Sequence, residues 1–288
     1  MKLHQATLAR TEVAAARVGR FLYVIGGFEA RRGRTTAAVE RYDLARDRWR
    51  VVAPLPIAVN HAAAAALGGH LYVLGGYRDA TGLTRPTAAL FRYDPARNRW
   101  RRLPAAPTAR GALAMAAIRG RLYAAGGVDP AGRALTTLEV YDIDRRRWRR
   151  GPDMAVPREH LTAAALGGRL YVIAGRRAGA GNLDAVERYD PRRDRWARLP
   201  GLGHPRGGIA SAAVGGGVVV VGGEEAAGTI ASVERFDPRR GRWSALPDLP
   251  TPRHGLGAAA WRGRVYVAEG GPRPGLAYSN ALEALEVG

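Results

Sequence analysis

Short apolar runs separated by turn residues follow one another along the whole chain, and residues 158–199 show the pattern most clearly. The small-residue run LTAAAL at 161–166 is followed by a glycine turn and by LYVIAG at 170–175. After a polar loop, AVERYD at 185–190 alternates between apolar and polar residues, and RWARL at 195–199 follows another turn. Such runs, bounded by Gly, Pro and Asp, predict β-strands joined by hairpins. No segment has a sustained helical period, so the sequence predicts an all-β protein.

The same order of runs returns about every 48 residues, and three markers recur in phase. Tryptophans lie in the fourth run of five periods, at Trp49, Trp100, Trp148, Trp196 and Trp243. An aromatic residue followed by aspartate ends the third run, at Tyr42-Asp43, Tyr93-Asp94, Tyr141-Asp142, Tyr189-Asp190 and Phe236-Asp237. Glycine pairs end the second run, at Gly26-Gly27, Gly75-Gly76, Gly126-Gly127, Gly222-Gly223 and Gly270-Gly271, with a degenerate pair at Ala174-Gly175.

A glycine pair after an apolar strand, then Tyr-Asp, then Trp, resembles the Kelch repeat. The resemblance covers residues 1–288 and implies one domain, a six-bladed β-propeller whose blades are four-stranded antiparallel sheets. It also implies an interaction module whose binding face carries the blade connections and the second turn of each blade.

The last repeat stops after its third strand. Residues 282–287, LEALEV, match the third strand LEVYD at 138–142, but no Tyr-Asp pair or tryptophan follows them. Alignment of Arg10 with the arginines of later repeats puts residues 2–8 at the outer-strand position. We therefore expect the N-terminal strand to complete the last blade.

Composition and charge narrow the possible chemistry. The chain has no cysteine, which excludes a disulfide framework and thiolate ligands or nucleophiles. Its first residues, MKLHQATLAR, lack the apolar core of a signal peptide, so we expect a cytoplasmic protein without a membrane span. The net charge is +20, and every basic residue except Lys2 is arginine. Nucleic acid is a less favoured partner, because the turn arginines alternate with aspartates and lack aromatic residues for base stacking.

Five arginines share one repeat position in the blade connections, at Arg10, Arg110, Arg158, Arg206 and Arg253. One interpretation is a ligand-binding ring near the channel mouth, because guanidinium groups suit carboxylates and phosphates. The other interpretation is structural, with each arginine paired to a carboxylate or backbone carbonyl so that it braces the connection.

Departures from the repeat are further candidates. Glu269 precedes Gly270, where the other repeats have Ile25, Leu74, Ala125, Ile173 and Val221. A carboxylate in an apolar slot needs a partner or a proton, so Glu269 either pairs with an arginine or acts as an acid or base. His61, His160 and His254 lie just after the arginine position, with Glu12 and Glu159 beside it. His61 and His254 are candidate ligand-binding residues, and Glu269, Glu159 and His160 are candidate catalytic residues.

The favoured function is therefore a binding module for an acidic protein or peptide or a small anionic molecule, without a cofactor. The alternative is a sugar-acid mutarotase or epimerase, similar to a six-bladed sialic-acid mutarotase related to this family, in which channel Glu and His move protons. A copper radical oxidase of the same family needs a Cys–Tyr cross-link, which this chain cannot form. No HExxH or His–Cys spacing is present, so no metal site is predicted.

Overall fold

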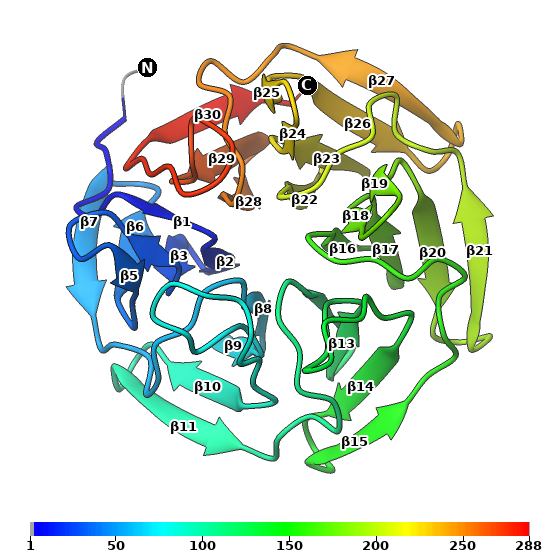
Figure 1. Ribbon diagram of the computed structural model, residues 1–288, viewed down its shortest axis with the longest axis horizontal. Coiled ribbons are helices and arrows are strands. Elements are labelled where there is room, and N and C mark those ends of the chain that lie inside the picture. Colours follow the sequence, from blue (N-terminus) through cyan, green and yellow to red (C-terminus); the bar gives the residue numbers. More distant parts are fainter. Residues whose placement is uncertain (1–2, 288) are drawn as a thin grey trace.

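A computed structural model describes residues 3–287, which form six antiparallel sheets arranged around one axis (Figure 1). Five sheets have four strands. The first blade contains β2 Ala14–Val18, β3 Phe21–Ile25, β6 Val39–Asp43 and β7 Arg48–Val52, and the second contains β8 Ala63–Leu67, β9 His70–Leu74, β10 Leu90–Asp94 and β11 Arg99–Leu103. The third contains β12 Ala114–Ile118, β13 Arg121–Ala125, β14 Leu138–Asp142 and β15 Arg147–Arg150, and the fourth contains β16 Thr162–Leu166, β17 Arg169–Ile173, β20 Val186–Asp190 and β21 Arg195–Leu199. The fifth contains β22 Ala210–Val214, β23 Gly217–Val221, β26 Val233–Asp237 and β27 Arg242–Leu246. The sixth sheet contains β28 Gly257–Trp261, β29 Arg264–Ala268 and β30 Leu282–Glu286. Among the described residues, there is no helix able to cross a lipid bilayer.

The innermost strand of each blade contacts the innermost strand of the next, in the order β2, β8, β12, β16, β22, β28 and back to β2. Just before each of these strands, backbone hydrogen bonds join neighbouring blades. The N–H groups of His61, Ala112, His160, Gly208, Gly255 and Val13 donate to the carbonyls of Glu12, His61, Ala112, His160, Gly208 and Gly255, at 2.8–3.2 Å. These six hydrogen bonds run once around the axis, so the structure confirms the predicted all-β propeller and agrees with six blades.

Further hairpins cover one face of the ring. The connection into each blade pairs with the second-turn loop of that blade. In the first blade, β1 Arg10–Thr11 pairs with β4 Phe28–Glu29, which pairs with β5 Arg34–Thr35. The fourth and fifth blades carry the two-stranded hairpins β18 Arg176–Arg177 with β19 Gly181–Asn182, and β24 Glu224–Glu225 with β25 Gly228–Thr229. Connections and second-turn loops therefore share one face, as the sequence predicted.

The core lies between adjacent blades, and the tryptophans of the outer strands contribute to it. Trp196 packs against Tyr189 of its own blade, with ring centroids 5.2 Å apart. Its Nε1–H donates to the carbonyl of Pro152 in the preceding segment, at 2.8 Å. Trp100 makes the equivalent bond to Ala53 at 2.9 Å. Each of these side chains thus fills space and links one outer strand to the chain segment before it.

The N-terminal segment does not form the predicted outer strand of the sixth blade. Residues 3–8 contain no strand, and β30 is the last strand of a three-stranded sheet within the described residues. Instead of a strand ladder, the segment forms separate contacts: Ala6 N–H donates to Asn280 O at 2.8 Å, and Trp49 Nε1–H donates to His4 O at 2.8 Å. Leu3 packs against the core between the first and sixth blades. The N-terminal segment therefore closes the seam through side chains and single hydrogen bonds, while Met1 and Lys2 lie outside the described residues.

Removal of residues 1–8 tests this seam. The truncated chain loses the bonds to Asn280 and Trp49 and the contact of Leu3 with the core, so its free energy of unfolding should fall by about 3 kcal/mol. Urea denaturation followed by tryptophan fluorescence measures the change. A synthetic peptide of residues 1–8 added in excess should restore part of the loss. An unchanged transition midpoint would contradict the structural role of the segment.

Candidate functional site

The five repeat arginines do not form a ligand-binding ring, which corrects the first interpretation of them. Their side chains are 0% exposed, and each guanidinium pairs with a glutamate on the third strand of its own blade. The pairs are Arg10–Glu40, Arg110–Glu139, Arg158–Glu187, Arg206–Glu234 and Arg253–Glu283. Because a completely buried guanidinium cannot meet an incoming ligand, the structural interpretation is correct.

The fourth blade shows how such a pair braces a blade connection. Arg158 Nη2 lies 2.9 Å from Glu187 Oε1, and Arg158 Nη1 donates to the carbonyl of Ala185 at 2.7 Å. The other oxygen of Glu187 accepts the backbone N–H of Ala155 at 2.8 Å. The ion pair therefore joins the connection at residues 155–158 to the third strand.

The second blade lacks both members of the pair. Val59 and Phe91 occupy the two positions, and they pack in the same apolar cluster. An apolar pair of suitable volume often replaces a buried ion pair without loss of stability. The joint change of both positions indicates that each arginine and its glutamate form one structural unit.

Glu269 also has a structural environment, and its assignment to an apolar strand position was wrong. The strand β29 ends at Ala268, so Glu269 matches Gly26, Gly75, Gly126, Ala174 and Gly222, which all share its positive φ. Its side chain is 0% exposed, and Oε1 lies 2.8 Å from Arg10 Nη2 of the first blade. Burial raises the pKa of Glu269 to about 7, with Arg10 opposing the rise and Glu40 adding to it. This carboxyl therefore contacts the Arg10–Glu40 pair of the first blade and is buried away from any ligand in the channel.

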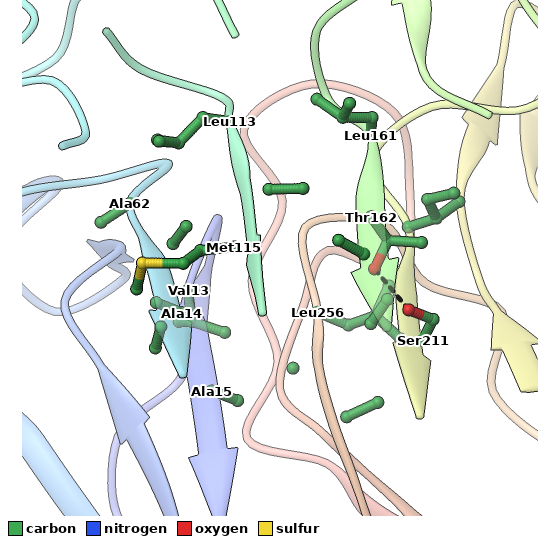
Figure 2. Close-up of a pocket in the computed structure, with 18 residues that line it drawn as sticks. Val13, Ala14, Ala15, Ala62, Leu113, Met115, Leu161, Thr162, Ser211 and Leu256 are labelled. Carbon is green, nitrogen blue, oxygen red and sulfur yellow. Dashed lines mark hydrogen bonds between the residues drawn. The ribbon is translucent and has the colours of Figure 1, made fainter. Parts of the chain in front are cut away.

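The side chains that line the central channel are mostly small or apolar. Figure 2 shows side chains that line it, among them Met115 of β12 and Leu113, Leu161 and Leu256, which each precede an innermost strand. The one polar contact drawn there joins Thr162 Oγ1 and Ser211 Oγ, 2.8 Å apart. The channel wall therefore offers little chemistry, and the candidate site lies at its mouth.

A pocket of about 180 Å³ lies at this mouth, on the face of the connections and second-turn loops. We call it the axial pocket. Its polar lining consists of Glu12, His61, Thr81, His160, Arg176, Glu224 and His254. Its apolar lining consists of Phe28, Leu83 and Leu276, with Gly275 beside them. Three of the predicted site residues, His61, His160 and His254, thus come together from the second, fourth and sixth blades.

The ring of backbone hydrogen bonds includes two of these histidines, His61 and His160, together with Glu12. Its positions 12, 61, 112, 160, 208 and 255 all have positive φ. Glycine satisfies this conformation at Gly208 and Gly255, whereas Glu12, His61 and His160 adopt it at φ of 54°, 52° and 50°. A left-handed conformation at residues with large side chains carries strain that the surrounding fold must hold. The strained positions are those that direct Glu12, His61 and His160 into the pocket.

Glu159 joins the network through its pairing with the second-turn hairpin. Glu159 and Arg176 exchange backbone hydrogen bonds, and Arg176 Nε donates to Glu159 Oε1 at 2.7 Å. The other carboxylate oxygen of Glu159 bonds to Nδ1 of His160. Arg176 also reaches Glu224 Oε1 at 3.0 Å and His160 Nε2 at 3.0 Å. A single guanidinium thus holds two glutamates and one histidine.

Burial sets the protonation of the pocket residues. It raises the pKa of Glu12 to about 8, an effect that nearby Glu224 reinforces and Arg176 opposes. It lowers the pKa of His61 to about 3, helped by the positive charges of Arg176 and His254. Burial also holds the pKa of His160 well below its ordinary value, and its neighbours His61, Arg176 and His254 add to this effect. At neutral pH, His61 and His160 are therefore neutral imidazoles.

Comparison with known proteins identifies the family. A family model described as the KLHDC2/KLHL20/DRC7 Kelch-repeats domain matches residues 12–200 and 60–271. The chain belongs to the Kelch-repeat family. The Kelch-like protein terF of Aspergillus terreus is 31% identical over 126 residues, which cover 41% of this chain and 27% of that protein. The match thus spans little more than a quarter of the relative.

A solved propeller, described as the structure of YjhT, has a similar overall fold. Its TM-score to this Kelch propeller is 0.84, and the match covers 99% of this chain and 97% of the other. The sequences are 17% identical, so the likeness concerns the fold alone.

Four important residues of the axial pocket escaped the sequence analysis: Arg176, Glu224, Leu83 and Leu276. All four belong to second-turn loops, which differ in length and composition among the Kelch repeats. Loop variation on a regular scaffold was the only sequence signal for them. Which loop residues reach the axis depends on how each hairpin folds back over its blade.

The ion pair of the fourth blade can be tested against the apolar pair of the second. Glu187→Phe leaves Arg158 buried without its carboxylate and should lower the free energy of unfolding by about 3–5 kcal/mol. Arg158→Val combined with Glu187→Phe reproduces the residues of the second blade and should recover most of that loss. Urea denaturation of both single variants and the double variant measures the coupling. Purely additive losses would contradict the single-unit interpretation, and Arg192→Val in an exposed turn is the control.

The raised pKa of Glu269 predicts a specific pH dependence. Between about pH 4.5 and 7, the folded chain keeps a proton on Glu269 that the unfolded chain loses, so this residue lowers stability as pH rises. Glu269→Gln removes that effect. The variant should become more stable relative to the wild type across this window, by up to about 3 kcal/mol, with a constant difference above it. Urea denaturation at a series of pH values measures the difference. A difference that is flat with pH would contradict the assignment, and exposed Glu286→Gln serves as the control.

Proposed function

We propose that this Kelch propeller is an interaction module that binds an acidic segment of a partner protein across the axial pocket. The observation that carries the proposal is the position of its exposed apolar residues. Val51, Leu83 and Leu276 are the large hydrophobic residues that stand out as exposed within residues 3–287. Two of them, Leu83 at 43% and Leu276 at 55% exposure, lie on the lip of the axial pocket. Exposed apolar side chains grouped around a cavity favour a binding surface.

The charge around the pocket supports an acidic partner. The loops that carry Leu83, Leu276 and Phe28 also expose arginines, at Arg31, Arg32, Arg34, Arg78, Arg85 and Arg273. Aspartate on these loops is engaged locally, since Asp79 accepts the backbone N–H groups of Thr84 and Arg85 at 2.8 and 2.7 Å. These surface arginines replace the five buried ones as the groups that would attract carboxylates, and guanidinium groups bind carboxylates well.

The floor of the pocket, which contains His61, His160, Arg176 and Glu224, favours a different ligand charge from the loop arginines. Glu159 and Glu224 share a single guanidinium, that of Arg176, so the floor carries net negative charge and repels an anion. The side chain that enters the pocket is therefore apolar or a hydrogen-bond donor, while the acidic residues that flank it contact the loop arginines. This combination distinguishes the partner from a simple polyanion, which would bind the arginines without an anchor.

Selection from a random peptide display library tests the proposal. Peptides enriched on the wild-type protein should combine acidic residues with an apolar anchor. Their affinity, measured by fluorescence anisotropy, should fall at least tenfold for Leu83→Asp combined with Leu276→Asp, which is about 1.4 kcal/mol. Arg85→Glu combined with Arg273→Glu should also weaken binding, and salt should weaken binding to the wild type.

Val51→Asp is the matched control, because Val51 is 67% exposed on the outer strand β7, away from the pocket lining. It should leave peptide affinity unchanged. Enrichment of basic peptides, or full binding to the Leu83→Asp and Leu276→Asp protein, would refute the proposal.

A further inference from the structure

The three histidines of the axial pocket share one hydrogen-bonding arrangement. Nδ1 of His61 lies 2.6 Å from Asn60 Oδ1, and Nδ1 of His254 lies 3.1 Å from the carbonyl of Gly271. Nδ1 of His160 bonds to a carboxylate oxygen of Glu159. A partner that accepts a hydrogen bond from Nδ1 favours the tautomer in which Nε2 carries the lone pair, and at His160 the donor Arg176 faces Nε2 as this tautomer requires. Metal-binding histidines have the same arrangement, with an oxygen acceptor that orients the ring.

The Nε2 atoms of His61 and His254 both lie near the carboxyl group of Glu12. Glu12 Oε2 lies 3.1 Å from His61 Nε2, and Glu12 Oε1 lies 3.5 Å from His254 Nε2. Donor atoms of Glu12, His61 and His160 all lie within 4.8 Å of one another. Zn²⁺ binds imidazole nitrogen and carboxylate oxygen at about 2.0–2.2 Å, which brings ligand atoms to within roughly 4 Å of each other. Small side-chain movements would therefore complete a coordination sphere.

The charge of the pocket also favours a cation. Glu159 and Glu224 share the one guanidinium of Arg176, and Glu12 lines the same pocket as Glu224. The three glutamate side chains are only 11%, 13% and 14% exposed. Buried carboxylates without enough positive charge nearby are costly, and they either take up protons or bind a cation. A divalent ion would supply the missing charge at the point where these groups meet.

We propose that the axial pocket binds one divalent transition-metal ion of the Zn²⁺ type through Glu12, His61 and His160, with His254 adjacent as a fourth donor. Two nitrogen ligands and one oxygen ligand match the donor preferences of such ions, and the pocket side leaves room for a further ligand. The inference adds an inorganic ligand to the pocket and stands whether or not an acidic peptide binds above it.

Arg176 competes with the metal. Its Nη2 donates to Nε2 of His160 at 3.0 Å, which uses the lone pair that the metal would need. The side chain is 34% exposed and belongs to the surface hairpin β18–β19, so it can withdraw toward solvent. Metal uptake therefore exchanges a guanidinium for a metal ion at His160. This competition predicts an effect that a purely structural network would not show.

Titration of metal-stripped protein with Zn²⁺ against a chromophoric chelator tests the proposal. The wild type should bind one ion per chain, and Co²⁺ should give the visible absorption of a site with mixed nitrogen and oxygen ligands. His61→Ala combined with His160→Ala should lower the affinity at least 100-fold, and Glu159→Gln about tenfold, because Glu159 only orients His160. Arg176→Met should raise the affinity.

His204→Gln is the matched control, because His204 is a surface histidine, 42% exposed, that contacts Glu225 outside the proposed ligand set. It should leave the affinity unchanged. If the double alanine variant does not fold, as judged by circular dichroism, His160→Gln alone replaces it. Binding that equals the wild type in the ligand variants, absence of a one-to-one complex, or weaker binding in Arg176→Met would overturn the proposal. The Leu83→Asp and Leu276→Asp protein should retain the metal, so the two proposals fail separately.

Discussion

The closed ring of six inter-blade hydrogen bonds is the constraint on which the rest of this molecule depends. Five of the bonds join equivalent positions just before successive innermost strands, and the sixth, from Val13 N–H to Gly255 O, returns to the first blade. All six of these positions have positive φ, and Glu12, His61 and His160 line the axial pocket from three of them. The fold thus creates six axial positions, and the sequence decides which carry chemistry.

The buried arginine–glutamate pairs hold those axial positions in place. Each arginine lies two residues before a ring position and ties the connection to the third strand of its blade. The desolvation cost of such a pair is offset by its additional bonds to backbone carbonyls, as at Arg158 and Ala185. Val59 and Phe91 achieve the same linkage by apolar packing. Every repeat therefore keeps a contact between the blade connection and the third strand, either as an ion pair or as apolar packing.

The axial pocket combines two environments that favour ligands of opposite charge. Its floor has converging histidines and glutamates around Arg176, while its lip has exposed leucines with arginines on the same loops. A cation suits the floor, and an acidic segment suits the lip. A metal ion in the floor would also reduce the negative charge beneath an acidic partner, so the two proposed ligands are compatible.

The sequence by itself determined the all-β class, the six repeats and the face on which connections and second-turn loops meet. It could do so because strand periodicity, glycine pairs and tryptophans are local patterns that repeat in phase. It also singled out His61, His160 and His254 as departures from the repeat.

Only the tertiary structure decided which charged residues are accessible. Arg158 and Arg176 are the same residue type, yet the first is sealed behind Glu187 and the second lies in the pocket. Because β29 ends at Ala268, Glu269 lies in the turn after the strand and not in the strand itself, and there it pairs with Arg10 from the other end of the chain. The N-terminal segment met the last blade without becoming a strand. Burial and long-range pairing depend on how distant blades pack, and no local pattern of residues encodes that.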